Sequence, residues 1–139
     1  MKKLFCLIPL IFFGLLFGCN AQEQPKGDSK ASITAPKKIT SAQAKAMMDE
    51  GKPYTLVDVR TADEYKMIRI KGAVLIPVNE IASRAEKELP DKNATILVYC
   101  RSGARSSAAA KTLAGMGYTN IYDMGGIVSW SYDTISDYN

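Results

Sequence analysis

The most informative feature for the fold of this chain is a short apolar run that ends on a cysteine. A helix-forming segment follows closely. Residues 96–99 read Ile-Leu-Val-Tyr, an uncharged β-branched and aromatic run that is typical of a strand buried on both faces of a sheet. Cys100 follows directly, and the alanine-rich stretch from Ser106 to Gly115 favours a helix. The sequence therefore predicts a strand, a tight loop that begins at Cys100, and the N-terminus of a helix.

The segments around this junction alternate between strand and helix patterns. Capping boxes at Thr40 and Thr61, each with Gln or Glu three residues later, predict helices that begin there. The remaining patterns predict strands at 54–59, 73–76 and 120–123, a helix at 79–89, and a final amphipathic segment at 127–135. This order predicts an α/β fold, a mostly parallel central sheet with helices on both faces. Ligands bind at the carboxyl ends of the strands in such sheets, and Cys100 lies at one of these ends.

The N-terminal segment has the features of a targeting signal. Residues 1–18 have two lysines directly after Met1 and continue as an apolar run, the outline of a signal peptide. As a helix, the run 4–18 would rise about 22 Å, which is less than the hydrocarbon core of about 30 Å. Its ending resembles the lipobox of bacterial lipoproteins, in which the chain is cut before a cysteine, here Cys19, that is then acylated. Cleavage near Ala21 without a lipid and an uncleaved anchor are the alternatives.

After the predicted signal peptide, the sequence predicts a tether and one folded domain. Residues 19–37 are polar, small or proline apart from Ile33 and predict a flexible tether. Residues 38–139 are long enough for one domain with its own core. We therefore expect an exported lipoprotein, anchored to a membrane and facing the periplasm or the cell exterior.

Composition excludes several classes of site. The chain contains no histidine, so a His-activated nucleophile and most zinc, copper and haem sites are not expected, and no cofactor is predicted. Its three cysteines lack a C-x-x-C spacing, which argues against a redox dithiol. The net charge of +4 is too small to indicate a nucleic-acid partner.

Without histidine, the loop itself must activate the thiol of Cys100. A free thiol has a pKa near 8.5, and the thiolate is the reactive form. Three sources of positive potential are expected: the N–H groups of the helix start, loop amides that Gly103 allows to converge, and the guanidinium groups of Arg101 and Arg105. Ser102 and Ser106 are predicted to act only through hydrogen bonds.

The segment Cys100-Arg-Ser-Gly-Ala-Arg-Ser106 resembles the active-site loop of the rhodanese superfamily of sulfurtransferases. Other landmarks follow in the family's order: Asp58-Val-Arg60 with Glu64-Tyr65, Ile70-Lys-Gly-Ala73 with Ile76-Pro77, and Gly125-Gly-Ile127 with Trp130. The resemblance implies a rhodanese fold and a Cys100 that accepts sulfane sulfur as a persulfide. It further implies that the sulfur is bound by the loop residues Arg101, Ser102, Gly103, Ala104 and Arg105, with support from Asp58, Arg60 and Ser106.

One position departs from the family pattern. Where the family commonly has Gly-His, this chain has Ile68-Arg69. The replacement is expected to alter the packing after the second helix and the charge near the pocket, where a further arginine would favour a more anionic donor.

Three functions are compatible with these residues. In the leading hypothesis, a sulfurtransferase moves sulfane sulfur from thiosulfate or a similar small anionic donor to a thiol or cyanide through a Cys100 persulfide, with Arg101 and Arg105 holding the anion. The alternative is a non-catalytic or relay module that passes sulfur to a partner protein. A cysteine phosphatase is disfavoured, because only residues 101–104 separate Cys100 from Arg105, one fewer than in Cys-x5-Arg loops.

Overall fold

The computed structural model describes residues 34–138, so the predicted signal peptide, Cys19 and most of the predicted tether lie outside the described residues. The elements in chain order are β1 (Lys37–Lys38), α1 (Ser41–Asp49), β2 (Thr55–Asp58), α2 (Ala62–Met67), β3 (Arg69–Ile70), β4 (Val74–Leu75), α3 (Ile81–Glu88), β5 (Ile96–Cys100), α4 (Ala104–Gly115), β6 (Ile121–Gly126), the 3-10 turn η1 (Ile127–Ser129) and β7 (Thr134–Ile135). Of the helices within residues 34–138, none combines the length and apolar character needed to cross a membrane.

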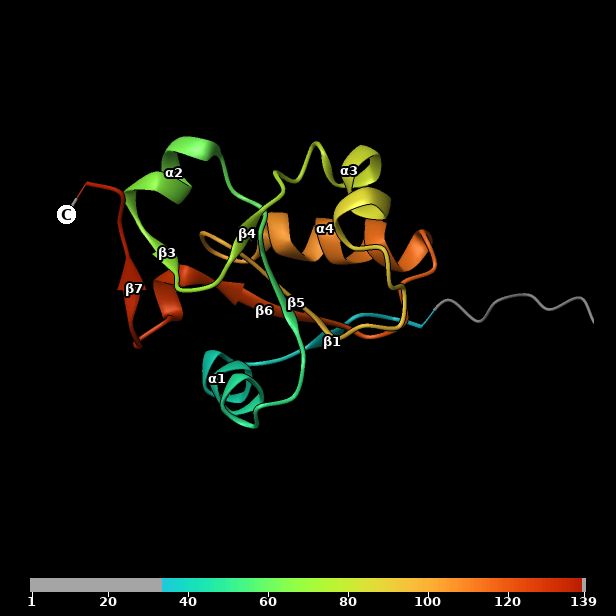
Figure 1. Cartoon of the computed structure of the whole chain (residues 1–139), viewed down its shortest axis with the longest axis horizontal. Helices are drawn as coiled ribbons and strands as arrows, with labels where there is room; N and C mark the ends of the chain where they lie inside the picture. Colours follow the sequence, from blue (N-terminus) through green and yellow to red (C-terminus); the bar gives the residue numbers. More distant parts are fainter. Residues whose placement is uncertain (1–33, 139) are drawn as a thin grey trace, which may run out of the picture.

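Five of the described strands form one sheet in the order β1-β6-β5-β2-β4, and all of its neighbouring strands are parallel (Figure 1). Strand β5 lies at the centre, paired with β2 on one side and β6 on the other. Its last residue, Cys100, is in register with Gly126 at the end of β6. The predicted α/β fold with a mostly parallel sheet is confirmed.

Helices cover both faces of this sheet. Helices α3 and α4 pack on one face and α1 on the other (Figure 1). Successive strand residues point to opposite faces, so Val98 and Cys100 join the core beneath α3 and α4, while Leu97 and Tyr99 join the core beside α1. The side chain of Cys100 therefore points to the same face of the sheet as the helix that follows it.

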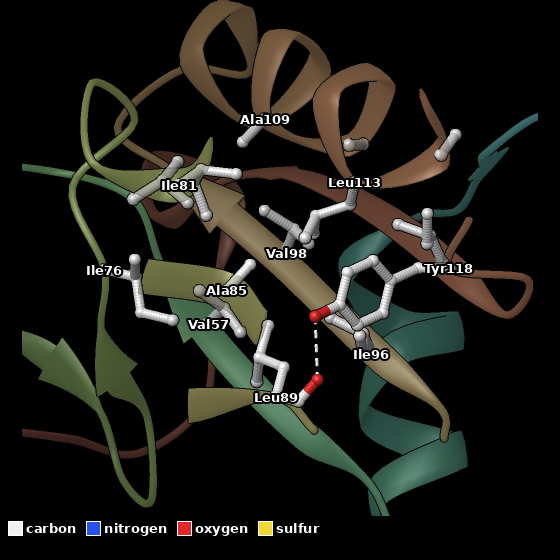
Figure 2. Close-up of a cluster of buried hydrophobic side chains, with 14 of the residues drawn as sticks. Val57, Ile76, Ile81, Ala85, Leu89, Ile96, Val98, Ala109, Leu113 and Tyr118 are labelled. Atoms are coloured by element: carbon white, nitrogen blue, oxygen red, sulfur yellow. Dashed lines mark hydrogen bonds between the residues drawn. The ribbon is translucent and has the colours of Figure 1, made fainter. Parts of the chain in front are cut away.

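The core beneath α3 and α4 fixes the position of the helix behind Cys100. Figure 2 shows Ile81, Ala85 and Leu89, spaced four residues apart, facing the strand residues of the sheet together with Leu113 of α4. The buried Tyr118 hydroxyl donates a 2.7 Å hydrogen bond to the Leu89 carbonyl oxygen, which links the chain after α4 to the end of α3 (Figure 2). This packing holds α4 rigidly against β5.

The structure corrects three boundaries. Lys37, predicted to end the tether, pairs with Tyr122 in the sheet. Helix α4 begins at Ala104 and not at the predicted Ser106, because Gly103 adopts a positive φ of 113° as its N-cap. The segment 127–135 is not one amphipathic element: it divides into η1 and β7, and β7 pairs with β3 across the sequence.

Candidate active site

The loop after β5 wraps its backbone around the sulfur of Cys100. The Gly103 N–H donates to Sγ at 3.0 Å, and the Cys100 side chain is almost completely buried. A side chain at position 103 would be strained, because its φ lies in the left-handed region that favours glycine. The loop thus places backbone donors and the N-terminus of α4 beside one sulfur atom.

Opposing effects act on the pKa of the Cys100 thiol. Burial raises the pKa, but hydrogen bonding from the backbone N–H groups of Ser106, Gly103 and Ser102 lowers it by more than burial raises it, so the net pKa lies below its ordinary value. The predicted activation by backbone amides has its geometric counterpart here. This arrangement favours the thiolate, the nucleophilic form of cysteine, without a proton-accepting side chain.

The end of β6 packs directly against the backbone of the cysteine loop. A Cβ atom at Gly126 would lie 2.6 Å from Ser102 Cα and 2.7 Å from the Arg101 carbonyl carbon, closer than side chains are ever found. The Val128 N–H also donates to the Arg101 carbonyl oxygen at 3.3 Å. Gly126 is therefore required for the close approach of two backbones.

A buried carboxylate that sequence reasoning did not single out completes the cradle. The Ser106 hydroxyl donates to Asp123 Oδ1 at 2.6 Å, and the Gly125 N–H donates to the same oxygen at 3.0 Å. Asp123 and Ser106 are both buried. Asp123 thereby connects the first turn of α4 to the end of β6. Its position near the carboxyl end of a strand was the one available signal.

Arg105 does not present a free charge to the loop. Its guanidinium donates two hydrogen bonds to the Glu64 carboxylate, at 2.7 and 2.8 Å, and so ties α4 to α2. The Arg105 bond is the main reason that the pKa of Glu64 falls to about 2, and the Thr61 capping bonds contribute. We predicted that Arg105 would hold the anionic substrate, whereas the structure matches its charge with a carboxylate.

A second ion pair lies at the end of the neighbouring strand β2. Arg60 Nε donates to Asp58 Oδ1 at 2.9 Å, and Nη2 donates to Asp58 Oδ2 and to the Ile68 carbonyl oxygen, each at 2.6 Å. Both side chains are buried. The predicted supporting residues Asp58 and Arg60 thus pair with each other and hold the chain after α2 against the sheet.

These elements surround a cleft of about 450 Å³ beside the cysteine loop. The cleft is lined by Arg60, Glu64, Met67, Ile68, Arg101, Ile127 and Val128. Arg60, Arg101 and Ile127 lie close after the ends of the adjacent parallel strands β2, β5 and β6, where ligands bind in open α/β sheets, and the other wall comes from α2 and the residue after it. The exposed Arg101 side chain lies at the cleft, directly after Cys100.

The two residues that depart from the expected Gly-His have different positions. Ile68 lines the cleft. Arg69 instead pairs with Asp137 at 2.6 Å and lies over the ring of Tyr65, so it adds no arginine to the cleft lining. The expectation that the replacement adds an arginine near the pocket is therefore wrong. The replacement instead adds an apolar residue, Ile68, to the wall of the cleft.

Comparison with known proteins agrees with this geometry. The model of the Rhodanese-like domain family matches residues 40–133, about two thirds of the chain. The chain belongs to the rhodanese family. Thiosulfate sulfurtransferase PspE of Escherichia coli is 39% identical over 71 residues, which cover 51% of this chain and 68% of PspE. The solved structure of a rhodanese with anions from E. coli has a TM-score of 0.58 and 33% identity, and covers 60% of this chain and 99% of that one.

Some relatives of this rhodanese domain are much longer proteins. The probable adenylyltransferase/sulfurtransferase MoeZ of Mycobacterium tuberculosis is 30% identical over 105 residues. The match covers 75% of this chain but 27% of MoeZ, so the chain spans about a quarter of that protein. The chain is therefore similar to most of one protein named as a sulfurtransferase and to a part of a longer one.

The rhodanese loop as a whole combines the predicted residues in two groups. Cys100, Ser102, Gly103 and Ser106 form the cradle itself, and Arg101 extends from it into the cleft lining. Ala104 is exposed at the first position of α4, where its backbone continues the loop. Within residues 34–138, no cluster of three or more His, Cys, Asp or Glu side chains is arranged to hold a metal ion.

Proposed function

We propose that this rhodanese domain is a sulfurtransferase that carries sulfane sulfur on Cys100. The observation that supports the proposal best is the buried Sγ at the end of β5, 3.0 Å from the Gly103 N–H and with a lowered pKa. A thiolate of this kind attacks electrophilic sulfur at neutral pH. Amide donors that stabilise the thiolate are also suited to the anionic persulfide. The names of PspE and MoeZ, both sulfurtransferases, support the same reaction class.

The reaction has two steps. The Cys100 thiolate attacks the outer sulfur of thiosulfate or a similar donor, the sulfur–sulfur bond of the donor breaks, and sulfite leaves with the bonding electron pair. A thiolate or cyanide acceptor then attacks the outer sulfur of the persulfide and releases Cys100 as a thiolate. Arg101 binds the anion at the cleft, while Arg105 positions α4 through Glu64.

The carboxylate beside the loop favours sulfur transfer over phosphoryl transfer. A cysteine phosphatase needs an acid that protonates the leaving alcohol. Glu64 lines the cleft, but its pKa of about 2 keeps it ionised at neutral pH, where it cannot donate a proton. The four-residue spacing between Cys100 and Arg105 points the same way.

The proposal is tested on the purified full chain with thiosulfate and cyanide. We expect the peptide that contains Cys100 to gain the mass of one sulfur atom, and cyanide to remove this sulfur as thiocyanate. Cys100→Ser should abolish both signals, whereas Thr112→Ala, on the exposed side of α4, should retain them. Thiocyanate formation at the wild-type rate in Cys100→Ser would refute the mechanism.

Transfer to a protein thiol is the second candidate, and the similarity to part of MoeZ supports it. In that case the persulfide forms with thiosulfate but is released slowly to cyanide. The persulfide sulfur would then be transferred to a protein that co-purifies with the chain faster than it is released to cyanide. Faster release to cyanide would assign the chain to small-molecule acceptors.

We also propose that residues 1–18 direct export and that Cys19 carries a lipid anchor facing the periplasm or the cell exterior. The support is the charged start, the apolar run and the lipobox-like ending at Cys19. Mass spectrometry of the mature chain should find an N-terminal acylated Cys19. A mature chain that begins near Ala21, or one that retains residue 1, would reject the anchor.

A further inference from the structure

One oxygen atom of Asp123 binds two segments that meet at the sulfur cradle. Asp123 Oδ1 accepts a 2.6 Å hydrogen bond from the Ser106 hydroxyl of α4 and a 3.0 Å hydrogen bond from the Gly125 N–H of β6. The Asp123 side chain is buried, and no lysine or arginine among residues 34–138 lies at salt-bridge distance from it. Because a buried carboxylate without a counter-ion is costly unless it is hydrogen-bonded, the fold favours the arrangement in which both bonds are made.

The Ser106 hydroxyl has one hydrogen atom and three oxygen acceptors within reach. Besides Asp123 Oδ1 at 2.6 Å, they are the carbonyl oxygens of Gly103 at 3.0 Å and Gly125 at 3.2 Å. The carboxylate oxygen is the nearest acceptor and the only charged one, so it takes the hydrogen atom. The hydroxyl is therefore engaged away from the sulfur of Cys100, and its effect is to fix the position of the first turn of α4.

Both segments that Asp123 binds carry or contact a donor to the sulfur. Burial raises the pKa of the Cys100 thiol, and the backbone N–H groups of Ser106 and Gly103 oppose this effect most. Gly103 in turn lies against Gly125, because a Cβ atom at Gly103 would be 3.6 Å from Gly125 Cα. A shift of Ser106 or Gly125 would change the direction of these N–H groups, and hydrogen bonds weaken steeply when they are misaligned.

We propose that Asp123 is a positioning residue for Cys100, which keeps the loop amides directed at the sulfur through Ser106 and Gly125. The inference extends the proposed sulfurtransferase function, since the same amides would stabilise the persulfide. Asp123 does not line the cleft beside Cys100. It lies instead on the wall of a separate pocket of about 110 Å³, which residues of β1 and α4 also line. Asp123 thus acts on the thiol without contact with the substrate.

Two other effects of Asp123 would have the opposite sign. Its negative charge disfavours a nearby thiolate, and its hydrogen bond withholds the Ser106 hydroxyl from the sulfur, so removal of either effect would lower the pKa of Cys100. Loss of positioning raises this pKa, because the N–H groups no longer point at Sγ. The direction of the change in Asp123→Ala therefore separates positioning from both alternatives.

The test measures the pH dependence of alkylation by iodoacetamide in the full chain, followed on the peptide that contains Cys100. Asp123→Ala should raise the pH midpoint by about one unit, the usual effect of one lost hydrogen bond to a charged group. At a fixed pH below the midpoint, persulfide formation from thiosulfate should become about tenfold slower, in proportion to the thiolate. Asp123→Asn retains an acceptor oxygen and should keep the midpoint at or below that of the wild type.

Two further variants separate positioning from a general loss of stability. Tyr118→Phe removes a buried hydrogen bond of the core, to the Leu89 carbonyl oxygen, and should leave the midpoint unchanged. Ser106→Ala removes only the hydroxyl that Asp123 binds and should raise the midpoint, so it provides the test if urea unfolding shows that Asp123→Ala does not fold.

A midpoint in Asp123→Ala that equals or falls below the wild-type value overturns the inference, as does an unchanged midpoint in Ser106→Ala. A midpoint raised equally by Tyr118→Phe overturns it too, because the effect would then be one of stability. Failure of the proposed function is a different outcome, in which the wild type forms no persulfide on Cys100. Alkylation needs no sulfur donor, so the midpoints still test the role of Asp123 in that case.

Discussion

The ion pair between Glu64 and Arg105 gives the sharpest test of how the loop helix is held. We consider Glu64→Gln, which removes the charge but keeps a residue that can complete the capping box with Thr61. Lowering the pKa of Glu64 from 4.5 to about 2 corresponds to about 3 kcal/mol. Because the two side chains are 28% and 33% exposed, solvent screening reduces the expected loss of unfolding free energy to about 1–2 kcal/mol.

The sign of the pH dependence follows from the lowered pKa. A carboxylate whose folded pKa is depressed stabilises the fold above its unfolded pKa, here 4.5, and this contribution is lost as the pH falls toward 2. Urea unfolding of wild type and Glu64→Gln at a series of pH values should therefore show a difference that is full at pH 7 and shrinks between pH 4.5 and 2.

Glu86→Gln is the matched control for this measurement. Glu86 pairs with Lys92, but both side chains are well exposed, so the change should cost less than about 0.5 kcal/mol at pH 7. The reasoning is refuted by equal stability of wild type and Glu64→Gln at pH 7. It is refuted equally by a difference that stays constant from pH 5 to pH 2.

Three further predictions concern the cradle and the core. Gly126→Ala should destabilise the fold by about 1–3 kcal/mol in urea unfolding and slow persulfide formation, because its Cβ would meet the backbone of residues 101–102; Gly115→Ala, with open space around it, should be neutral or stabilising. Alkylation of Cys100 by iodoacetamide should have a pH midpoint below that of free cysteine, and Gly103→Ala should raise that midpoint because the strained residue displaces the N–H that donates to Sγ, whereas an unchanged midpoint would exclude this donor. Tyr118→Phe should cost about 1–3 kcal/mol of unfolding free energy, since it leaves the buried Leu89 carbonyl without its side-chain donor, and a smaller loss would show that water replaces the hydroxyl.

Local patterns were readable from the sequence because their partners are close along the chain. The capping boxes at Thr40 and Thr61 are both present, each formed between residues three apart. The buried run that ends at Cys100 is strand β5, and its burial on both faces follows from its central place in a parallel sheet.

Contacts between distant segments could not be read in the same way. Arg69 and Ile70 pair with Ile135 and Thr134 in a short antiparallel ribbon, and two-residue strands carry no periodic signal of their own. Nothing in the spacing of residues indicated that Asp123 would accept a hydrogen bond from the Ser106 hydroxyl, although both residues lie at the sulfur cradle.

Local sequence patterns alone predict that a cysteine lies between a buried strand and a helix, that Gly103 allows the loop to turn, and that no histidine activates the thiol. These properties depend on backbone propensities within a few residues. The pairing of the charges depends on the tertiary structure, because each arginine has several possible carboxylate partners, and the partner of Arg105 depends on how α2 packs beside α4. In this packing Arg105 pairs with Glu64, and Arg101 lies at an apolar cleft beside Cys100.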